Sequence, residues 1–413
     1  MKIYIVLFSF LGFLGIYSWF SHKVGSWINV LTLQLVLSVP TLYLAELGYL
    51  SFFQATGSDL GYFIIYFTYF SSALAFAFGY LYIRIPETAT RFNTSIKSSY
   101  LLITAFLVGG IALYWPIMRE FTDDLFNPRR IYTATRTGYG LSYFGSMLLC
   151  YIFLVLTMFH DRISRFGKLS ALAVTVVFAY LHGSKGQVIA AVFIWVTYHF
   201  VARQRQIKLR GFLIFAAVTL LLGGSLFYFM LDSVELNQLF AIVAGYADYS
   251  RNAVMLVDTE TTTFFGRLTL EDNIYSRIPR ALFPDKPKDF GGFLLSMKYF
   301  PEAFLLDEGV PSFGIGIYYA DFSVFSILFL AICNFVGGII TKCFVVRLSL
   351  YRSPVDFLVL LFMSGITLLP IGSGYLLPEH VVISLLLFMC FKILSLRMTR
   401  RALPSGQFEQ ANQ

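Results

Sequence analysis

Residues 314–341 read GIGIYYADFSVFSILFLAICNFVGGIIT and contain a single charged side chain, that of Asp321. About 20 apolar residues are enough to cross the hydrocarbon core of a bilayer as an α-helix. The composition of the whole chain agrees, because 57% of its 413 residues are hydrophobic and 13% are charged, against about a quarter charged in soluble domains. The sequence therefore predicts an integral membrane protein built of helices.

Apolar windows of this kind recur along the chain and predict an all-α, polytopic fold with about eleven transmembrane helices. They lie near residues 2–20, 27–48, 60–83, 99–118, 139–159, 168–182, 186–202, 210–231, 314–341, 355–371 and 376–395. The predicted organisation is eight helices over 1–231, a large external loop over 232–313, three helices over 314–395 and a tail over 396–413. The sixth and seventh windows are short, so they predict either a tight hairpin or two half-helices.

The distribution of basic residues predicts the orientation. One set of alternate loops, with the C-terminal tail, holds 18 of the 31 Lys and Arg residues, and the other set carries an excess of acids. Because basic loops stay in the cytoplasm, we expect the N-terminus outside and the C-terminus inside. The loops of the basic set are short and contain neither a P-loop nor a glycine-rich dinucleotide turn, which argues against an ATP-driven pump or a sugar-nucleotide-dependent transferase.

The external loop over 232–313 carries the most informative polar segment, 276–287, which reads SRIPRALFPDKP. Arg277, Arg280 and Lys286 could converge there on one phosphate or diphosphate group, since guanidinium forks and ammonium groups both bind such anions. The alternative is that they neutralise nearby carboxylates or touch lipid headgroups. Upstream, 238–257 has apolar residues at helical spacing and predicts an amphipathic helix on the outer face. Its Arg251 faces a similar choice between a substrate phosphate and an internal pair with Asp248.

Two further cations are candidates for the same anion. Lys185 follows Gly183 and Ser184 at the predicted start of a helix, where free N–H groups and the positive end of the helix dipole favour an anion. A tight turn with a snorkelling lysine is the alternative. Arg136 enters the fifth apolar window, and an arginine at that depth is costly unless it is paired or lines a wet cavity.

Three residues could supply an acid, a base or an orienting group. Asp321 lies one turn into an apolar window, where a carboxylate needs a partner. Glu379 and His380 follow Pro378 at the start of the last window, and His380 could accept a proton from a sugar hydroxyl. A lone histidine at a helix start is more often simply hydrogen-bonded. The sequence contains no HExxH or CxxC pattern, so it predicts neither a metal site nor a cofactor.

Three segments together resemble a known family. They are Arg-Ile-Pro-Arg-x-Leu-Phe-Pro-Asp-Lys-Pro at 277–287, Gly-Ser-Lys-Gly at 183–186 and Gly-Ile-Gly-Ile-Tyr-Tyr-Ala-Asp-Phe at 314–322. With the polytopic architecture and the large outer loop, they resemble the Wzy-type polymerases of O-antigen and oligosaccharide repeat units. Many members have Gly-Ser-Arg at the turn. Lys185 in this chain keeps the charge but loses the bidentate fork.

The resemblance implies a GT-C-like glycosyltransferase of the bacterial inner membrane with its active site on the periplasmic face. It implies undecaprenyl-diphosphate-linked oligosaccharides as both substrates, no nucleotide sugar, and a chain-length regulator and a flippase as partners. The cations named above would bind the diphosphate, and Asp321, Glu379 or His380 would act on the attacking hydroxyl.

An O-antigen ligase is the nearest alternative, although residues 232–313 lack the histidine that such ligases have in their large outer loop. A flippase for lipid-linked sugars and a non-catalytic partner of an envelope assembly complex are the others.

Overall fold

The computed structural model describes most of the chain in enough detail to follow its packing. The described residues are 1–53, 56–85, 99–125, 128–135, 139, 141–183, 185–217, 221, 244–275, 278, 283–287, 289–305 and 311–363. Over these residues the regular structure is entirely helical, with no strand. The prediction of an all-α fold is confirmed to that extent.

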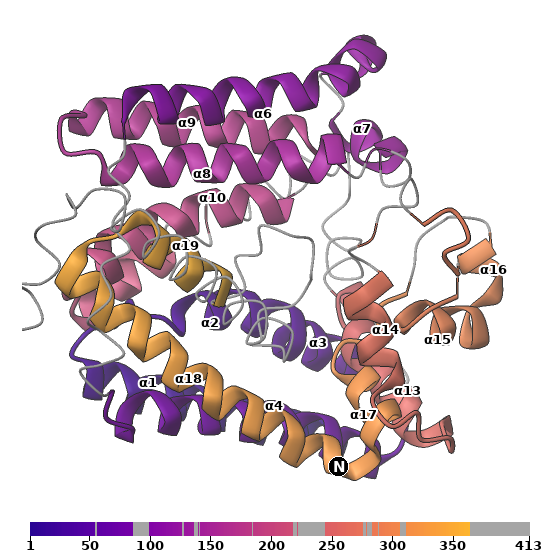
Figure 1. Ribbon diagram of the computed structural model, residues 1–413. Coiled ribbons are helices and arrows are strands. Elements are labelled where there is room, and N and C mark those ends of the chain that lie inside the picture. Colours follow the sequence, from indigo (N-terminus) through magenta and orange to yellow (C-terminus); the bar gives the residue numbers. More distant parts are fainter. Residues whose placement is uncertain are drawn as a thin grey trace, which may run out of the picture.

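One layer of the molecule consists of α1 (Lys2–Val24), α4 (Asp59–Tyr82) and α18 (Ser326–Tyr351), which pack side by side (Figure 1). The contact between α4 and α18 is close because small residues face the neighbouring backbone. A Cβ atom at Gly79 would collide with the carbonyl oxygen of Phe335, and one at Gly338 with that of Phe76. Without a hydrophobic force between helices in lipid, this kind of close backbone approach is what holds membrane helices together.

A second layer consists of α6 (Tyr100–Glu120), α8 (Ser146–Phe159) and α9 (Arg165–Leu181) (Figure 1). A short π-helix (Leu141–Gly145) precedes α8, and α10 (Lys185–Thr197) packs back against α9 and ends in a further π-helical turn (Tyr198–Ala202). The two short windows of the sequence therefore form a hairpin.

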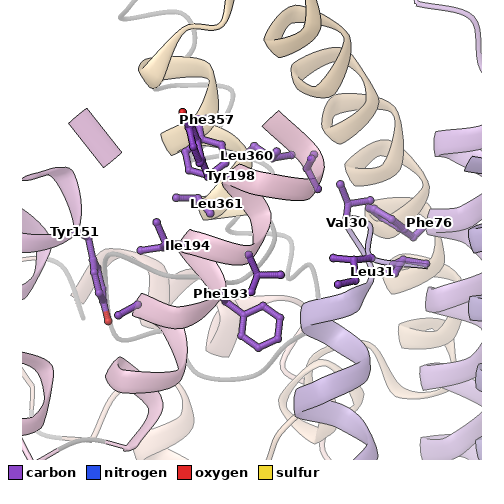
Figure 2. Packing of buried hydrophobic residues seen from close by; sticks show 14 of the residues in the cluster. Val30, Leu31, Phe76, Tyr151, Phe193, Ile194, Tyr198, Phe357, Leu360 and Leu361 are labelled. Carbon is purple, nitrogen blue, oxygen red and sulfur yellow. The ribbon is translucent and has the colours of Figure 1, made fainter. Parts of the chain in front are cut away.

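The layers are joined by α19 (Pro354–Met363), which contacts α18 on one side and α8 on the other. Its Phe357 ring packs against Phe159 of α8 and against Tyr198, and Figure 2 shows Leu360, Leu361 and Ile194 in the same interior. A buried ion pair, from Arg347 Nε to Asp356 Oδ1 at 3.1 Å, fixes α18 to the start of α19. Breaking such a buried pair would leave an uncompensated charge inside the protein.

Six of the described helices are long and apolar enough to cross a membrane, namely 2–24, 34–52, 59–82, 100–120, 142–159 and 316–351. The second of these comprises α2 (Thr32–Ser38), a π-helical turn (Val39–Leu44) and α3 (Ala45–Phe52). The helix over 186–202 is apolar but shorter. The predicted windows at 210–231 and 355–371 are only partly described and 376–395 lies outside the described residues, so the count of eleven stays a prediction.

An outer subdomain caps one end of the two layers, on the right of Figure 1. It contains α13 (Asp248–Thr259), α14 (Arg267–Tyr275), α15 (Gly292–Tyr299), α16 (Pro301–Leu305) and α17 (Gly316–Phe322). These helices share a small core of their own, made by Leu256, Leu268, Leu295, Phe313 and Ala320. A 3-10 turn (Ser323–Phe325) then leads directly into α18. The shorter loop between α6 and α8 contributes a 3-10 turn (Thr122–Asp124) and α7 (Pro128–Thr135).

The amphipathic helix predicted over 238–257 is described from residue 248 onward as α13. Its buried side chains, Ser250, Ala253, Val254 and Leu256, face α4 and α17. The Asp258 carboxylate near its end accepts hydrogen bonds from the Ser58 N–H, at 2.7 Å, and from the Ser58 hydroxyl. The apolar face of α13 is therefore packed on protein.

Candidate functional site

The cationic segment 276–287 follows α14 directly in the sequence, and α14 itself is held in place by a buried carboxylate. Asp321, at the end of α17, is completely buried and accepts hydrogen bonds from the first turn of α14. Its carboxylate receives the Leu268 N–H at 3.0 Å, the Thr269 N–H at 2.8 Å and the Thr269 hydroxyl at 2.6 Å. A carboxylate at a helix N-terminus satisfies N–H groups that the helix itself leaves free and complements its dipole. Asp321 thus acts as a cap for α14 from a distant part of the chain.

The far side of the segment is fastened to α14 as well. Glu271 accepts the Gly291 N–H at 3.0 Å, and Asp272 accepts the Gly292 N–H at 3.1 Å. Gly291 has a φ of +53°, and a Cβ atom there would collide with the Asp272 carboxylate. Only glycine tolerates both the left-handed backbone and the close approach. Gly291 and Gly292, which follow the cationic segment, therefore lie against α14.

Lys286 is the described cation of this segment. Its ammonium group donates to the carbonyl oxygen of Ile278 at 3.2 Å and lies 5.0 Å from the centre of the Phe290 ring. Both contacts hold the base of the loop together. Arg277 and Arg280 lie outside the described residues, so their place at this site stays a prediction.

Arg251 on α13 lies where the outer subdomain meets the transmembrane helices. It forms an ion pair with Asp248 one turn earlier, and its guanidinium carbon lies 4.0 Å from the centre of the Tyr49 ring of α3. The internal pair considered from the sequence is therefore present. Its Nε atom is nevertheless buried without a hydrogen-bond partner among the described residues. This nitrogen of the guanidinium group therefore takes no part in the ion pair with Asp248.

A buried carboxylate, that of Glu46 on α3, lies close enough to Arg251 for the two charges to attract each other. One oxygen of Glu46 accepts the Tyr62 hydroxyl at 2.6 Å, and the other is buried with no hydrogen-bond partner in the described structure. Buried carboxylates in membrane segments are costly and are usually kept for function. Glu46, Tyr62 and Arg251 form a polar cluster, which we call the Glu46 cluster, directly beneath the outer subdomain.

The sequence contains a signal for Glu46 that its apolar surroundings obscure. It is the one charged residue between Lys23 and Asp59, inside a segment long enough to span a membrane. The rule that picks out Asp321, namely that a carboxylate in an apolar helix needs a partner, picks out Glu46 equally well.

The sequence as a whole is similar to two proteins named O-antigen polymerase, one from Salmonella typhimurium and one from Salmonella typhi. Each is 31% identical to it over 369 residues, which make up 88% of this chain and 89% of the relative. The chain belongs to the O-antigen polymerase family. No family model matches the sequence, and no solved structure matches this fold. The six apolar helices and this membership together make the chain a multi-pass protein of the inner membrane.

The remaining predicted site residues of this chain are only partly described. Arg136, Glu379 and His380 lie outside the described residues. Lys185 begins α10, but its side chain is not described.

The turn before Lys185 is firmly held by His182. The buried His182 ring contacts Ser146 Oγ at 2.9 Å and the Phe178 carbonyl oxygen at 2.7 Å, and it stacks on Tyr114. In the part of the chain that the structure describes, no group of three His, Cys, Asp or Glu side chains could hold a metal ion.

A second ion pair stiffens the outer subdomain between α13 and α15. The Lys298 ammonium group donates to Glu260 at 2.7 Å, and the Tyr299 hydroxyl donates to the same oxygen at 3.0 Å. Burial alone would raise the pKa of Glu260, but the hydrogen bonds from Lys298, the Thr262 N–H and Tyr299 outweigh it and lower the pKa below its usual 4.5. This pair ties the end of α13 to α15.

Proposed function

We propose that this O-antigen polymerase joins lipid-linked O-antigen repeat units into a longer polysaccharide. The observation that carries this proposal is the similarity to O-antigen polymerases over 88% of the chain. The outer subdomain adds support, because it holds a cationic segment at one end of a helical membrane protein. A transferase of lipid-linked glycans needs such a segment there.

The proposed donor is a glycan linked to undecaprenyl diphosphate. In the transfer, the C–O bond between the growing glycan and the diphosphate breaks. A hydroxyl of the next lipid-linked repeat unit forms the new glycosidic bond, and its proton passes to a base. Preorganised cations stabilise the negative charge that develops on the departing diphosphate.

The proposed diphosphate site combines cations from the outer subdomain and from the ends of the membrane helices. Arg251 is the best supported of them, because it lies at the junction of the two and keeps an unused nitrogen. The others are Arg277, Arg280, Lys286, Arg136 and Lys185.

Several residues are candidates for the base that accepts the proton of the attacking hydroxyl. Glu379 and His380 remain candidates from the sequence. Asp321 has both carboxylate oxygens occupied by α14, which favours a positioning role for it. Glu46 joins the candidates, because it has a buried oxygen without a partner and lies close to Arg251. A general base needs such a free acceptor within reach of the hydroxyl.

We further propose that the outer subdomain faces the periplasm, with the N-terminus outside and the C-terminus inside. The basic loops support this orientation, and the N-terminus lies at the same end of the molecule as the outer subdomain (Figure 1). A chain-length regulator and a flippase are the partners that such a polymerase would need.

The experiment that tests this function is glycan profiling in the native host. Deleting the gene should collapse the ladder of O-antigen chains to the core plus a single repeat unit. A plasmid copy should restore the ladder, and Arg280→Ala should fail to restore it while inserting normally in the membrane. Arg130→Ala is the matched control, because Arg130 is an exposed arginine already paired with Asp124. Long chains accumulating on the lipid carrier, with none on the core, would instead mean that the enzyme is a ligase.

A further inference from the structure

A cavity of about 1100 Å³ lies at the end of the molecule opposite the outer subdomain. It is partly open and is lined by the start of α6, the end of α8, the start of α9, the π-helical turn after α10, and the junction of α18 with α19. The outer subdomain, which carries Arg251, lies where α18 begins, whereas the lining residues Tyr351 and Arg352 lie where α18 ends; Figure 1 shows the course of α18. The cavity is therefore separate from the outer subdomain.

The walls of the cavity carry a strong excess of positive charge. The cations come from three separate segments of the chain and are Arg162, Arg165, Lys168, Arg203, Arg205 and Arg352. Asp161 is the one carboxylate among the lining residues. No ion pair joins any of the six cations to a carboxylate of the described chain. An anion in the cavity would therefore meet several cations that form no ion pair with a described carboxylate of the protein.

The interior of the cavity also holds unused hydrogen-bonding groups. Both ring nitrogens of His199 are buried and have no partner among the described residues. Buried polar atoms normally have a partner, so an unpartnered pair points to a missing ligand or water. The charges of Arg165, Lys168, Arg203 and Arg205 all act on this ring.

Apolar rings line the same space. The Trp195 ring lies tilted against the His199 ring, with the two ring centres 4.6 Å apart, and Phe159 and Tyr198 form the neighbouring wall. A ligand that fits this wall has an anionic part for the cations and an apolar part for the rings.

We propose that this cavity binds the phosphodiester headgroup of an anionic membrane lipid. The tendency of basic residues to stay in the cytoplasm accounts for the side on which these cations lie. It does not account for their convergence around one cavity. Basic pockets between membrane helices on the cytoplasmic side are suited to anionic headgroups, and the negative surface potential of that leaflet adds to the attraction. The lipid would hold together the loops that join α8 to α9 and α18 to α19.

The test is a titration of the purified full-length protein with phosphatidylglycerol, with bound lipid counted by native mass spectrometry. Arg203→Gln/Arg205→Gln removes two cavity cations. Lys208→Gln/Arg210→Gln removes two cations that follow closely in the sequence but do not line the cavity, so it is the matched control. Phosphatidylcholine and inorganic phosphate serve as the competing ligands.

We expect tight binding of phosphatidylglycerol to the wild type, and binding about 30-fold weaker to Arg203→Gln/Arg205→Gln, since each basic residue near such a headgroup contributes about a fivefold factor. The control should bind like the wild type, and all three proteins should melt at the same temperature. Equal loss in the two double variants would overturn the proposal, because it would mean that overall charge is responsible. Displacement of the lipid by inorganic phosphate at equal concentration would also overturn it, in favour of a soluble anion. Equally tight binding of phosphatidylcholine would show that charge plays no part.

Discussion

Replacing Asp321 separates a positioning role from a catalytic one. Its buried carboxylate receives three hydrogen bonds from the first turn of α14, and α14 leads into the cationic segment. Asp321→Ala removes all three, and Asp321→Asn keeps an acceptor but loses the charge. If Asp321 positions α14, both changes should loosen the outer subdomain, and Asp321→Asn should do so less.

The magnitude follows from the hydrogen bonds. A hydrogen bond to a charged group contributes about 1.5–3 kcal/mol, and removal of a helix cap costs about 0.5–2 kcal/mol. We therefore expect Asp321→Ala to cost about 3 kcal/mol locally, and Asp321→Asn about half of that. Since about 1.4 kcal/mol is a tenfold change in an equilibrium, the opened subdomain should become about 100-fold more populated in Asp321→Ala and about tenfold in Asp321→Asn.

The assay combines proteolysis with glycan length. Trypsin can cut after Arg267, whose side chain is 60% exposed, and the rate of cutting follows the population of the open form when opening is fast. Trypsin should cut both variants faster than the wild type. The variant that is cut faster should also make fewer long glycan chains. An Asp321→Asn protein that resists trypsin like the wild type but makes no polymer would refute this reasoning and would identify Asp321 as the base.

Three further changes test other parts of the structure. Arg251→Gln should slow polymerisation by about 100-fold, the usual cost of losing one preorganised donor, and Arg251→Lys should retain part of the activity; chain length on gels measures both. Glu260→Gln should remove a pH dependence: the pKa of Glu260 is lowered in the folded protein, so its pair with Lys298 stabilises the outer subdomain above pH 4.5 and is lost as the pH falls further. Wild type should then become trypsin-sensitive in acid, and a Glu260→Gln protein with the same acid response would contradict the assignment. Gly79→Ala should cost about 1–3 kcal/mol by forcing α4 away from α18, seen as a lower melting temperature in detergent, whereas Gly15→Ala, with no described atom within 4 Å, should change nothing.

The helical character of the fold is predictable from the sequence because lipid leaves few alternatives to a helix. Windows such as 60–83 and 99–118 correspond to α4 and α6 almost residue for residue. What the windows could not predict is the interruption of helices by π-turns, as at Val39–Leu44, because such turns depend on packing against neighbours.

The site was harder to predict because tertiary contacts decide what each charge does. Asp321 looked like an acid or base, since an isolated carboxylate in an apolar window has no visible partner. Its partners, the N–H groups of Leu268 and Thr269, lie some 50 residues away in the sequence. For Glu46 the sequence did hold the necessary information, because it is the one charged residue between Lys23 and Asp59. Its apolar neighbours nevertheless made the segment look like an ordinary transmembrane helix.

The outer subdomain is attached to the membrane helices at both of its ends. Asp258 binds Ser58 near its beginning, and α17 continues through a single 3-10 turn into α18 at its end. With two attachments, the subdomain is fastened to α4 and to α18 at once, so it cannot swing away from the long helices as a rigid body unless the contact between Asp258 and Ser58 breaks.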